Sequence, residues 1–346
     1  MRHVLIGIYL LSTTTVFGAG PILSTKDLES PPPRIIRTCC SFGSDMKLMV
    51  FPAIKITDIT SIEKLGTHHY LGAPEEGNGI IYTQKGGFID IGHLRDIADW
   101  TAFLYTKIMT TREDGFFELK LGHEGGLKTL SLDIPTDLNS FDAATLAGRI
   151  AYDLSVWHEI ATWFGASTVP LMPERYSSFS IEDAYSNLLG ARLGIEALKS
   201  DLPYEVAMTK LIAQTLENFN AVSTEEQTYA AMEAVRDIWW TRDKKLPSRK
   251  VLLHRQLTVY PVVTPLLISP SDDGFVTALE VPNQMSNGHP LSDFYTLNFK
   301  LNLKFPHRKI FPERKTRDIT QEDFQTLLDY IQQDLEKPKY QLKDKL

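Results

Sequence analysis

The chain has 346 residues, of which 43% are hydrophobic and 23% are charged, and its formal net charge is -7. This composition is that of an ordinary globular protein and excludes collagen-like and coiled-coil chains. Because Asp and Glu (43) outnumber Lys and Arg (36), we expect no nucleic-acid partner. Two cysteines cannot build a disulfide scaffold.

Residues 1–20 have the pattern of a secretory signal peptide. Arg2 and His3 form a short basic start, Val4–Leu11 is apolar, and small residues follow at 18–20. The apolar run is shorter than the ~20 residues that a membrane span needs. The alternative, a buried N-terminal strand or helix, fits poorly with the polar, proline-containing segment that follows. We therefore expect an exported protein, periplasmic or at the cell surface, with no membrane span.

Residues 21–33 contain three consecutive prolines and predict an extended linker without a helix. Residues 34–245 predict a mainly helical, catalytic region. It starts with short strands at 48–51, 79–83 and 88–91, where apolar runs are broken by Gly and Pro. Apolar residues spaced by three and four predict a helix over 91–110. Alternating residues then predict a hairpin of 116–121 and 127–134, with a solvated turn at 123–126.

Further helices are expected at 140–164, from Ser180 onward, at 204–218 and at 224–240. Residues 246–337 predict a β-rich region with strands at 251–260, 275–281 and 294–305, ending in a helix over 320–335. The charged segment between the two regions is short, so we expect them to pack as one α+β unit. Residues 338–346 predict a frayed tail.

The helix over 140–164 carries the sequence His158-Glu159-Ile160-Ala161-Thr162. In His-Glu-x-x-His hydrolases, two histidines on one helix face bind zinc and the Glu activates water. Here Thr162 replaces the second histidine, so the motif is incomplete. The alternative is a histidine that is hydrogen-bonded in a polar pocket of the core.

Two neighbouring segments offer the missing ligands. His93, Asp96 and Asp99 are spaced by three at the start of the predicted helix 91–110 and share one face; they equally suit a helix N-terminus, where the dipole favours acids. Glu182 lies at the start of the following helix, beside Asp183, which capping alone explains. We therefore predict that His93, His158 and Glu182 bind the metal. The residues expected to support them are Asp96, Asp99, Thr162, Asp183 and Asn187.

Four motifs together resemble an uncharacterised family, a domain of unknown function from exported proteins of Gram-negative envelopes. They are TCCSFG (38–43), GGFIDIGHLRDIADW (86–100), WHEIATW (157–163) and FSIEDAYSN (179–187). The resemblance covers residues 34–198. It implies residence in the periplasm or at the cell surface, and it does not indicate which activity, if any, the protein has.

Two functions fit these patterns. The first is a zinc-dependent hydrolase of the cell envelope, which cleaves an amide or ester bond with Glu159 as the base. The second is a non-catalytic envelope protein that binds a partner or polymer and whose polar cluster is structural. A cysteine nucleophile, Cys39 or Cys40 with His68 or His69 as base, is a third and weaker alternative.

Overall fold

The computed structural model describes residues 20–37, 41–46, 57–167, 174–244, 248–269 and 276–337. The predicted signal peptide, the two cysteines, the strand at 48–51 and the predicted tail lie outside these described residues. The predicted α+β class is confirmed, because eight α-helices and three antiparallel sheets make up the described part of the chain. None of its helices is both long and apolar enough to span a bilayer.

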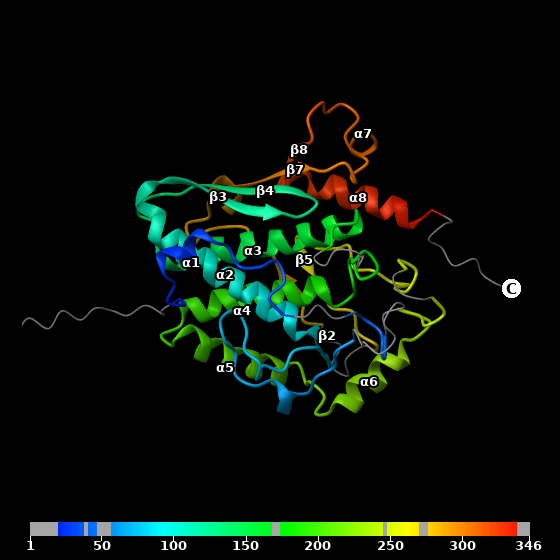
Figure 1. Cartoon of the computed structure of the whole chain (residues 1–346). Helices are drawn as coiled ribbons and strands as arrows, with labels where there is room; N and C mark the ends of the chain where they lie inside the picture. Colours follow the sequence, from blue (N-terminus) through cyan, green and yellow to red (C-terminus); the bar gives the residue numbers. More distant parts are fainter. Residues whose placement is uncertain are drawn as a thin grey trace, which may run out of the picture.

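Three helices form the centre of the molecule (Figure 1): α2 (Ile91–Thr111), α3 (Ser140–Trp163) and α4 (Asp183–Lys199). Their apolar side chains belong to one buried cluster. Two glycines of α4 allow its backbone to approach α2 closely. A Cβ atom at Gly190 would collide with the carbonyl oxygen of Leu94, and one at Gly194 would lie 3.2 Å from Cα of Ala98. This close approach fixes the starts of α2 and α4 relative to each other.

A four-stranded antiparallel sheet covers one side of the helices, in the order β3–β4–β7–β8. Its strands are β3 (Phe116–His123), β4 (Gly126–Asp133), β7 (Tyr295–Leu301) and β8 (Asp318–Thr320). The predicted hairpin is therefore present as β3 and β4, and β4 pairs in turn with β7. The ring of Trp157 in α3 stacks on Phe299 of β7, with centroids 4.0 Å apart. This stacking ties the sheet to the central helix.

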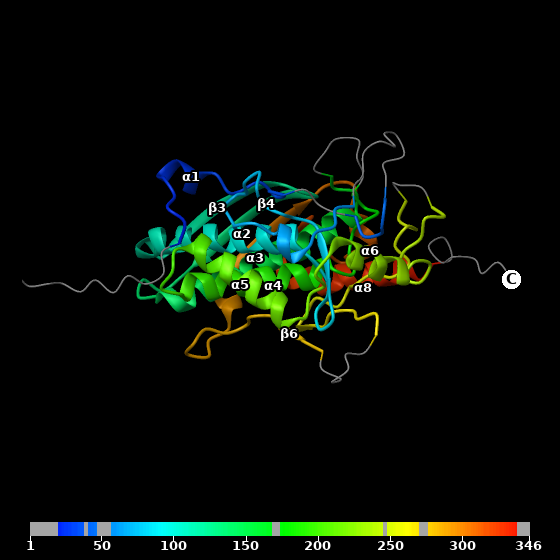
Figure 2. The same ribbon diagram turned by 90° about the horizontal axis from the view of Figure 1, so that it is seen from below.

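The remaining elements surround this core. Helix α5 (Tyr204–Asn218) lies alongside α4, on the side away from the large sheet (Figures 1 and 2), and α8 (Phe324–Leu335) packs against α3. The smaller elements are β1 (Ile80–Thr83), β2 (Gly87–Asp90), α6 (Glu225–Ala234), β5 (Val262–Val263), β6 (Leu279–Glu280) and α7 (His307–Ile310).

Some predicted boundaries were wrong. The proline-rich linker contains a short helix, α1 (Thr25–Glu29), because Ser24 and Asp27 form a capping box ahead of the prolines. The helix predicted from Ser180 begins only at Asp183. Helix α6 ends at Ala234 rather than near residue 240, because Trp240 leaves the helix and bridges to Leu252.

The predicted strands at 251–260 and 275–281 were also wrong over most of their described length. No strand lies within 251–260 in the described structure, where only Leu252 forms an isolated bridge; the two-residue β5 follows at Val262–Val263, and the two-residue β6 is the strand found within 276–281. Pro261 and Pro265, which lack an N–H donor, flank β5 and shorten it. The alternating apolar residues instead anchor loops, since Val251 and Val259 are buried without belonging to a strand.

Candidate functional site

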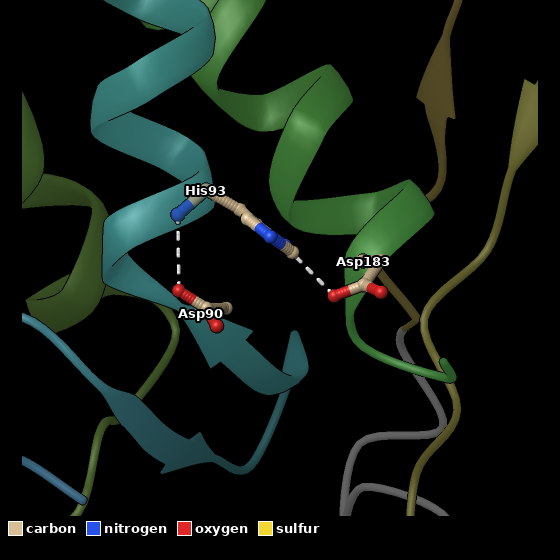
Figure 3. Close-up of side chains that lie close together, drawn as sticks. All are labelled: Asp90, His93 and Asp183. Carbon is tan, nitrogen blue, oxygen red and sulfur yellow. Dashed lines mark hydrogen bonds and ion pairs between the residues drawn. The ribbon is translucent and has the colours of Figure 1, made fainter. Parts of the chain in front are cut away.

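The starts of α2 and α4 bring three ligand-type side chains together (Figure 3). Asp90, the last residue of β2, caps α2 by accepting a hydrogen bond from the His93 N–H at 3.0 Å. The Nδ1 atom of His93 lies 2.8 Å from Oδ1 of Asp183, the first residue of α4. One ligand atom from each of the three residues lies within 4.8 Å of the other two, and all three residues are buried. We call Asp90, His93 and Asp183 the buried triad.

The local sequence explains why these residues meet. The hairpin β1–β2 runs directly into α2. Asp90 is therefore the N-cap of that helix, and its carboxylate accepts from the first turn. The Asp90 N–H donates to the Ser186 hydroxyl at 2.9 Å, which ties the end of β2 to α4. The carboxylates of Asp90 and Asp183 both lie at helix N-termini, where the helix dipole favours negative charge.

Two more buried carboxyl groups lie close to the buried triad. Oε2 of Glu159, in α3, accepts a hydrogen bond from the Phe179 N–H at 2.5 Å. Burial and the negative charge of Asp183 raise the pKa of Glu159 from 4.5 to about 7. Oε2 of Glu182 accepts from the Ser180 hydroxyl at 2.5 Å, and burial and the Asp183 charge raise the pKa of Glu182 well above its ordinary value.

The region is therefore rich in buried carboxyl groups. Burial also raises the pKa of Asp90. His93 forms an ion pair with Asp183, and its charge also opposes the raised pKa of Asp90 and Glu159. Oδ2 of Asp90 and Oε1 of Glu182 are buried without a hydrogen-bond partner among the described residues. Such a cluster either holds protons or binds a cation.

A cavity with about 40 Å³ of room for water lies beside the site, and His93 is the member of the triad that lines it. His93 and His158 both line it, as do Asn187 and Ser155. Nδ1 of His158 lies 2.8 Å from Oε1 of Glu124 and 2.8 Å from Nη1 of Arg34. That nitrogen either donates to the carboxylate or accepts from the guanidinium, according to its tautomer.

The model of one protein family, described as "Protein of unknown function (DUF4056)", matches residues 27–269 of the chain. The chain belongs to the DUF4056 family. The resemblance expected from the four motifs is thereby confirmed as regards the family, and every site residue described so far falls inside the match. Comparison with curated proteins and with solved structures finds no match for the chain.

In this DUF4056 protein, the predicted metal ligands occupy different surroundings. His93 belongs to the buried triad, whereas His158 contacts Glu124 and Glu182 contacts Ser180. Asp183, predicted to support the site, is instead part of the triad. Asn187 lines the cavity that His93 also lines.

Asp96 and Asp99 bind Arg37 and do not belong to the triad. Nη1 of Arg37 lies 3.0 Å from Oδ1 of Asp96 and 2.9 Å from Oδ2 of Asp99, while its Nε lies 2.6 Å from Glu76. His68 also contacts Asp99, at 3.0 Å. The sequence reasoning missed Arg37 and Glu76, because residues so far from the helix start carry no spacing signal for this contact.

Thr162 and the hairpin turn also differ from expectation. The Thr162 hydroxyl donates to its own helix, at the carbonyl of His158, and accepts from Ser178. Glu124 in the turn is buried rather than solvated, since the turn folds onto α3, where the Trp157 indole donates to the Glu124 carbonyl at 3.0 Å. His123 is exposed, as expected of a turn residue.

Asp90 was the ligand-type residue of the triad that the sequence reasoning did not select. A signal for it existed, because Asp at the junction of a strand and a helix, three residues before His93, is a helix N-cap pattern. That pattern explains the residue fully as a cap, so nothing in the sequence pointed to a second role.

Proposed function

We propose that this protein is a metal-dependent hydrolase of the bacterial cell envelope that cleaves an amide or ester bond. Its ion would be held by Asp90, His93 and Asp183, and Glu159 would accept a proton from the attacking water. The observation that carries the proposal is the buried triad itself, whose His93 lines a cavity.

The residues fit a divalent cation. In a tetrahedral zinc site, ligand atoms at about 2.0–2.2 Å from the ion lie about 3.3–3.6 Å from one another. The triad atoms lie within 4.8 Å of one another, so they would have to move closer together when an ion binds. One imidazole and two carboxylates suit zinc and also manganese. A bound ion would supply a water of lowered pKa and polarise the substrate carbonyl. Zinc remains our first choice, and a metal panel distinguishes it from manganese.

Glu159 suits the role of general base. A base works best when its pKa lies near the working pH, and burial together with Asp183 brings the pKa of Glu159 to about 7. The Phe179 N–H holds one carboxylate oxygen of Glu159, which fixes the orientation of the group. The other oxygen is then available to hold a water molecule.

The compartment and substrate class are part of the same proposal. The signal-like residues 1–20 favour export, and amide bonds of peptides or peptidoglycan stems and ester bonds of lipids are accessible outside the cytoplasm. Asn187 and Ser155 on the cavity wall offer hydrogen bonds to such a substrate.

The alternative is a non-catalytic envelope protein whose polar residues are structural. The contacts of Asp96 and Asp99 favour it, because this part of the predicted site is used to hold Arg37. Burial also raises the pKa values of Asp90 and Glu182, and protonated carboxyl groups need no metal.

The test combines metal binding with turnover. Mature protein is stripped with EDTA and titrated calorimetrically with Zn²⁺, Mn²⁺ and Mg²⁺, and the variant Asp183→Asn is compared with His289→Ala, which alters an exposed histidine elsewhere. We expect one ion per chain in wild type and in His289→Ala, and at least about a hundredfold weaker binding in Asp183→Asn. Equal binding in all three proteins contradicts the metal site.

Turnover is then measured on peptidoglycan, peptide and ester substrates. Glu159→Gln keeps the shape of the side chain but cannot accept a proton, so it should retain the metal and lose most of the activity. A variant that retains full activity contradicts the role of Glu159 as base.

A further inference from the structure

Arg34 inserts its guanidinium group into the wall of the cavity. Its Nη1 lies 2.6 Å from Oε1 of Glu124 and 2.8 Å from Nδ1 of His158, and its Nη2 lies 2.9 Å from Oε2 of Glu174. The two terminal nitrogens therefore contact two different carboxylates. We call Glu124, His158 and Glu174 the guanidinium pocket.

The pocket is built by elements other than the segment that carries Arg34. Glu124 comes from the turn between β3 and β4, His158 from α3, and Glu174 from the loop that leads to α4. Lys128 holds the other oxygen of Glu124 at 2.6 Å. Glu124 is buried, and the cations around it keep its pKa well below the usual range although burial opposes this. The pocket thus presents a fixed negative charge.

The segment that carries Arg34 is attached to the molecule by other residues. The backbone N–H groups of Ile36 and Arg37 donate to Asp96, and the Trp100 indole donates to the Pro33 carbonyl. The Arg37 side chain, only 3% exposed, is bound by three carboxylates. The Arg34 side chain is 16% exposed at the cavity. Its guanidinium can therefore leave the pocket while the segment stays in place.

We infer that the guanidinium pocket is a binding subsite for the guanidinium group of a ligand, such as an arginine side chain of a peptide, and that Arg34 occupies it when no ligand is bound. The subsite opens onto the cavity that His93 also lines. The inference does not depend on a bound metal. Combined with the proposed hydrolase, it makes an arginine-containing peptide the substrate class.

The geometry favours guanidinium over ammonium. A planar guanidinium offers N–H donors in diverging directions, which suits two carboxylates that approach different nitrogens. An ammonium group is a compact point charge and cannot reach Glu124 and Glu174 from the same carbon framework in this way. A neutral group of the same shape leaves the buried Glu124 with less compensating charge.

The test replaces Arg34 and supplies the missing group as a small molecule. Arg34→Ala is titrated with methylguanidinium, methylammonium and the neutral methylurea, followed by calorimetry and by the NMR signals of the His158 ring. We expect saturable binding of methylguanidinium that shifts the His158 signals, about tenfold weaker binding of methylammonium, and no binding of methylurea. Wild type and the control Arg149→Ala, which removes a different ion-paired arginine, should show no such binding.

Two further variants locate the bound group. Adding Glu174→Gln to Arg34→Ala should weaken the binding of methylguanidinium about tenfold, and adding Glu124→Gln should weaken it at least as much. If Arg34→Ala does not fold alone, it is refolded in methylguanidinium, methylammonium or methylurea; recovery of the folded protein with methylguanidinium is expected, and no recovery with any of the three overturns the inference. Absence of saturable binding in the folded variant, or binding that survives both glutamate changes, overturns the inference. Neither result bears on metal binding, which is measured separately.

Discussion

At the scale of single residues, the site depends on how burial acts on carboxyl groups. Burial raises the pKa values of Asp90, Glu159 and Glu182, and the negative charge of the neighbouring Asp183 adds to the effect. Burial acts on Glu124 as well, but Lys128, His158 and Arg34 outweigh it and lower the pKa of that group. The pKa of a buried carboxyl group therefore rises beside the triad and falls at Glu124, according to the charges around it.

Glu159 should make the metal-free protein less stable as the pH rises. Its pKa is about 7 in the folded state and 4.5 as the ordinary value, so the folded state binds more protons between these pH values. The free energy of unfolding should therefore fall from pH 4.5 to 7, and Glu159→Gln should remove this part of the decrease. Urea unfolding in EDTA at pH 5, 6, 7 and 8 measures both proteins. Equal pH dependence in wild type and variant would contradict the raised pKa.

Metal content should separate the two histidines. His93→Ala removes a member of the buried triad and should abolish metal binding, whereas His158 contacts Glu124 and its replacement should leave the ion in place. Elemental analysis after dialysis measures both variants beside wild type. Loss of the ion in His158→Ala as well would restore the set His93, His158 and Glu182 that the sequence suggests.

At the scale of elements, the contact between α2 and α4 positions the site. Asp90 and His93 lie at the start of α2, and Asp183 lies at the start of α4. A small rotation of one helix would therefore separate the ligand atoms. Gly190 sets the distance between the two backbones, because its missing side chain leaves room for the carbonyl of Leu94.

Gly190→Ala should consequently destabilise the protein and weaken metal binding together. The added Cβ collides with backbone rather than with a flexible side chain, so relief requires a shift of the helix. We expect a loss of about 1–3 kcal/mol in the free energy of unfolding. Glu196→Ala, on the exposed face of the same helix, serves as control and should change the stability by less than about 0.5 kcal/mol. Unchanged stability of Gly190→Ala would show that α2 and α4 do not approach this closely.

At the scale of the whole molecule, the large sheet joins distant parts of the sequence. Strand β7 lies beyond the region that matches the DUF4056 family, yet it pairs with β4 along its length. Phe299 of β7 and Phe324 of α8 both stack on Trp157 at the centre of α3. The family-matched residues alone therefore leave an unpaired strand edge and an uncovered tryptophan.

A chain that ends at residue 269 should not fold stably. It would expose the edge of β4 and the aromatic ring of Trp157, which are a site for aggregation and a loss of core packing. Thermal unfolding followed by circular dichroism, with the chain 20–337 as control, measures this. A cooperative transition of the shorter chain near that of the control would show that residues 270–337 form a dispensable addition.

The sequence by itself predicted the helices and strands whose periodicity is strong. Helices α2, α3 and α5 and the hairpin β3–β4 follow their apolar patterns to within a few residues, since these patterns reflect which face must be buried. The short strands β5 and β6 and the end of α6 were not predictable in this way. Buried loops produce the same alternation of apolar residues as strands, and local patterns cannot tell them apart.

The motif analysis selected His93 as a metal ligand and Asp183 only as a supporting residue, both near expected helix starts. Only the tertiary structure decided which side chains lie within reach of one another. It placed Asp90 beside His93, directed His158 toward Glu124 and Arg34, and gave Asp96 and Asp99 to Arg37. The physical reason is that the side-chain type determines which chemistry a residue can perform, and the packing of helices from distant parts of the chain determines its partners.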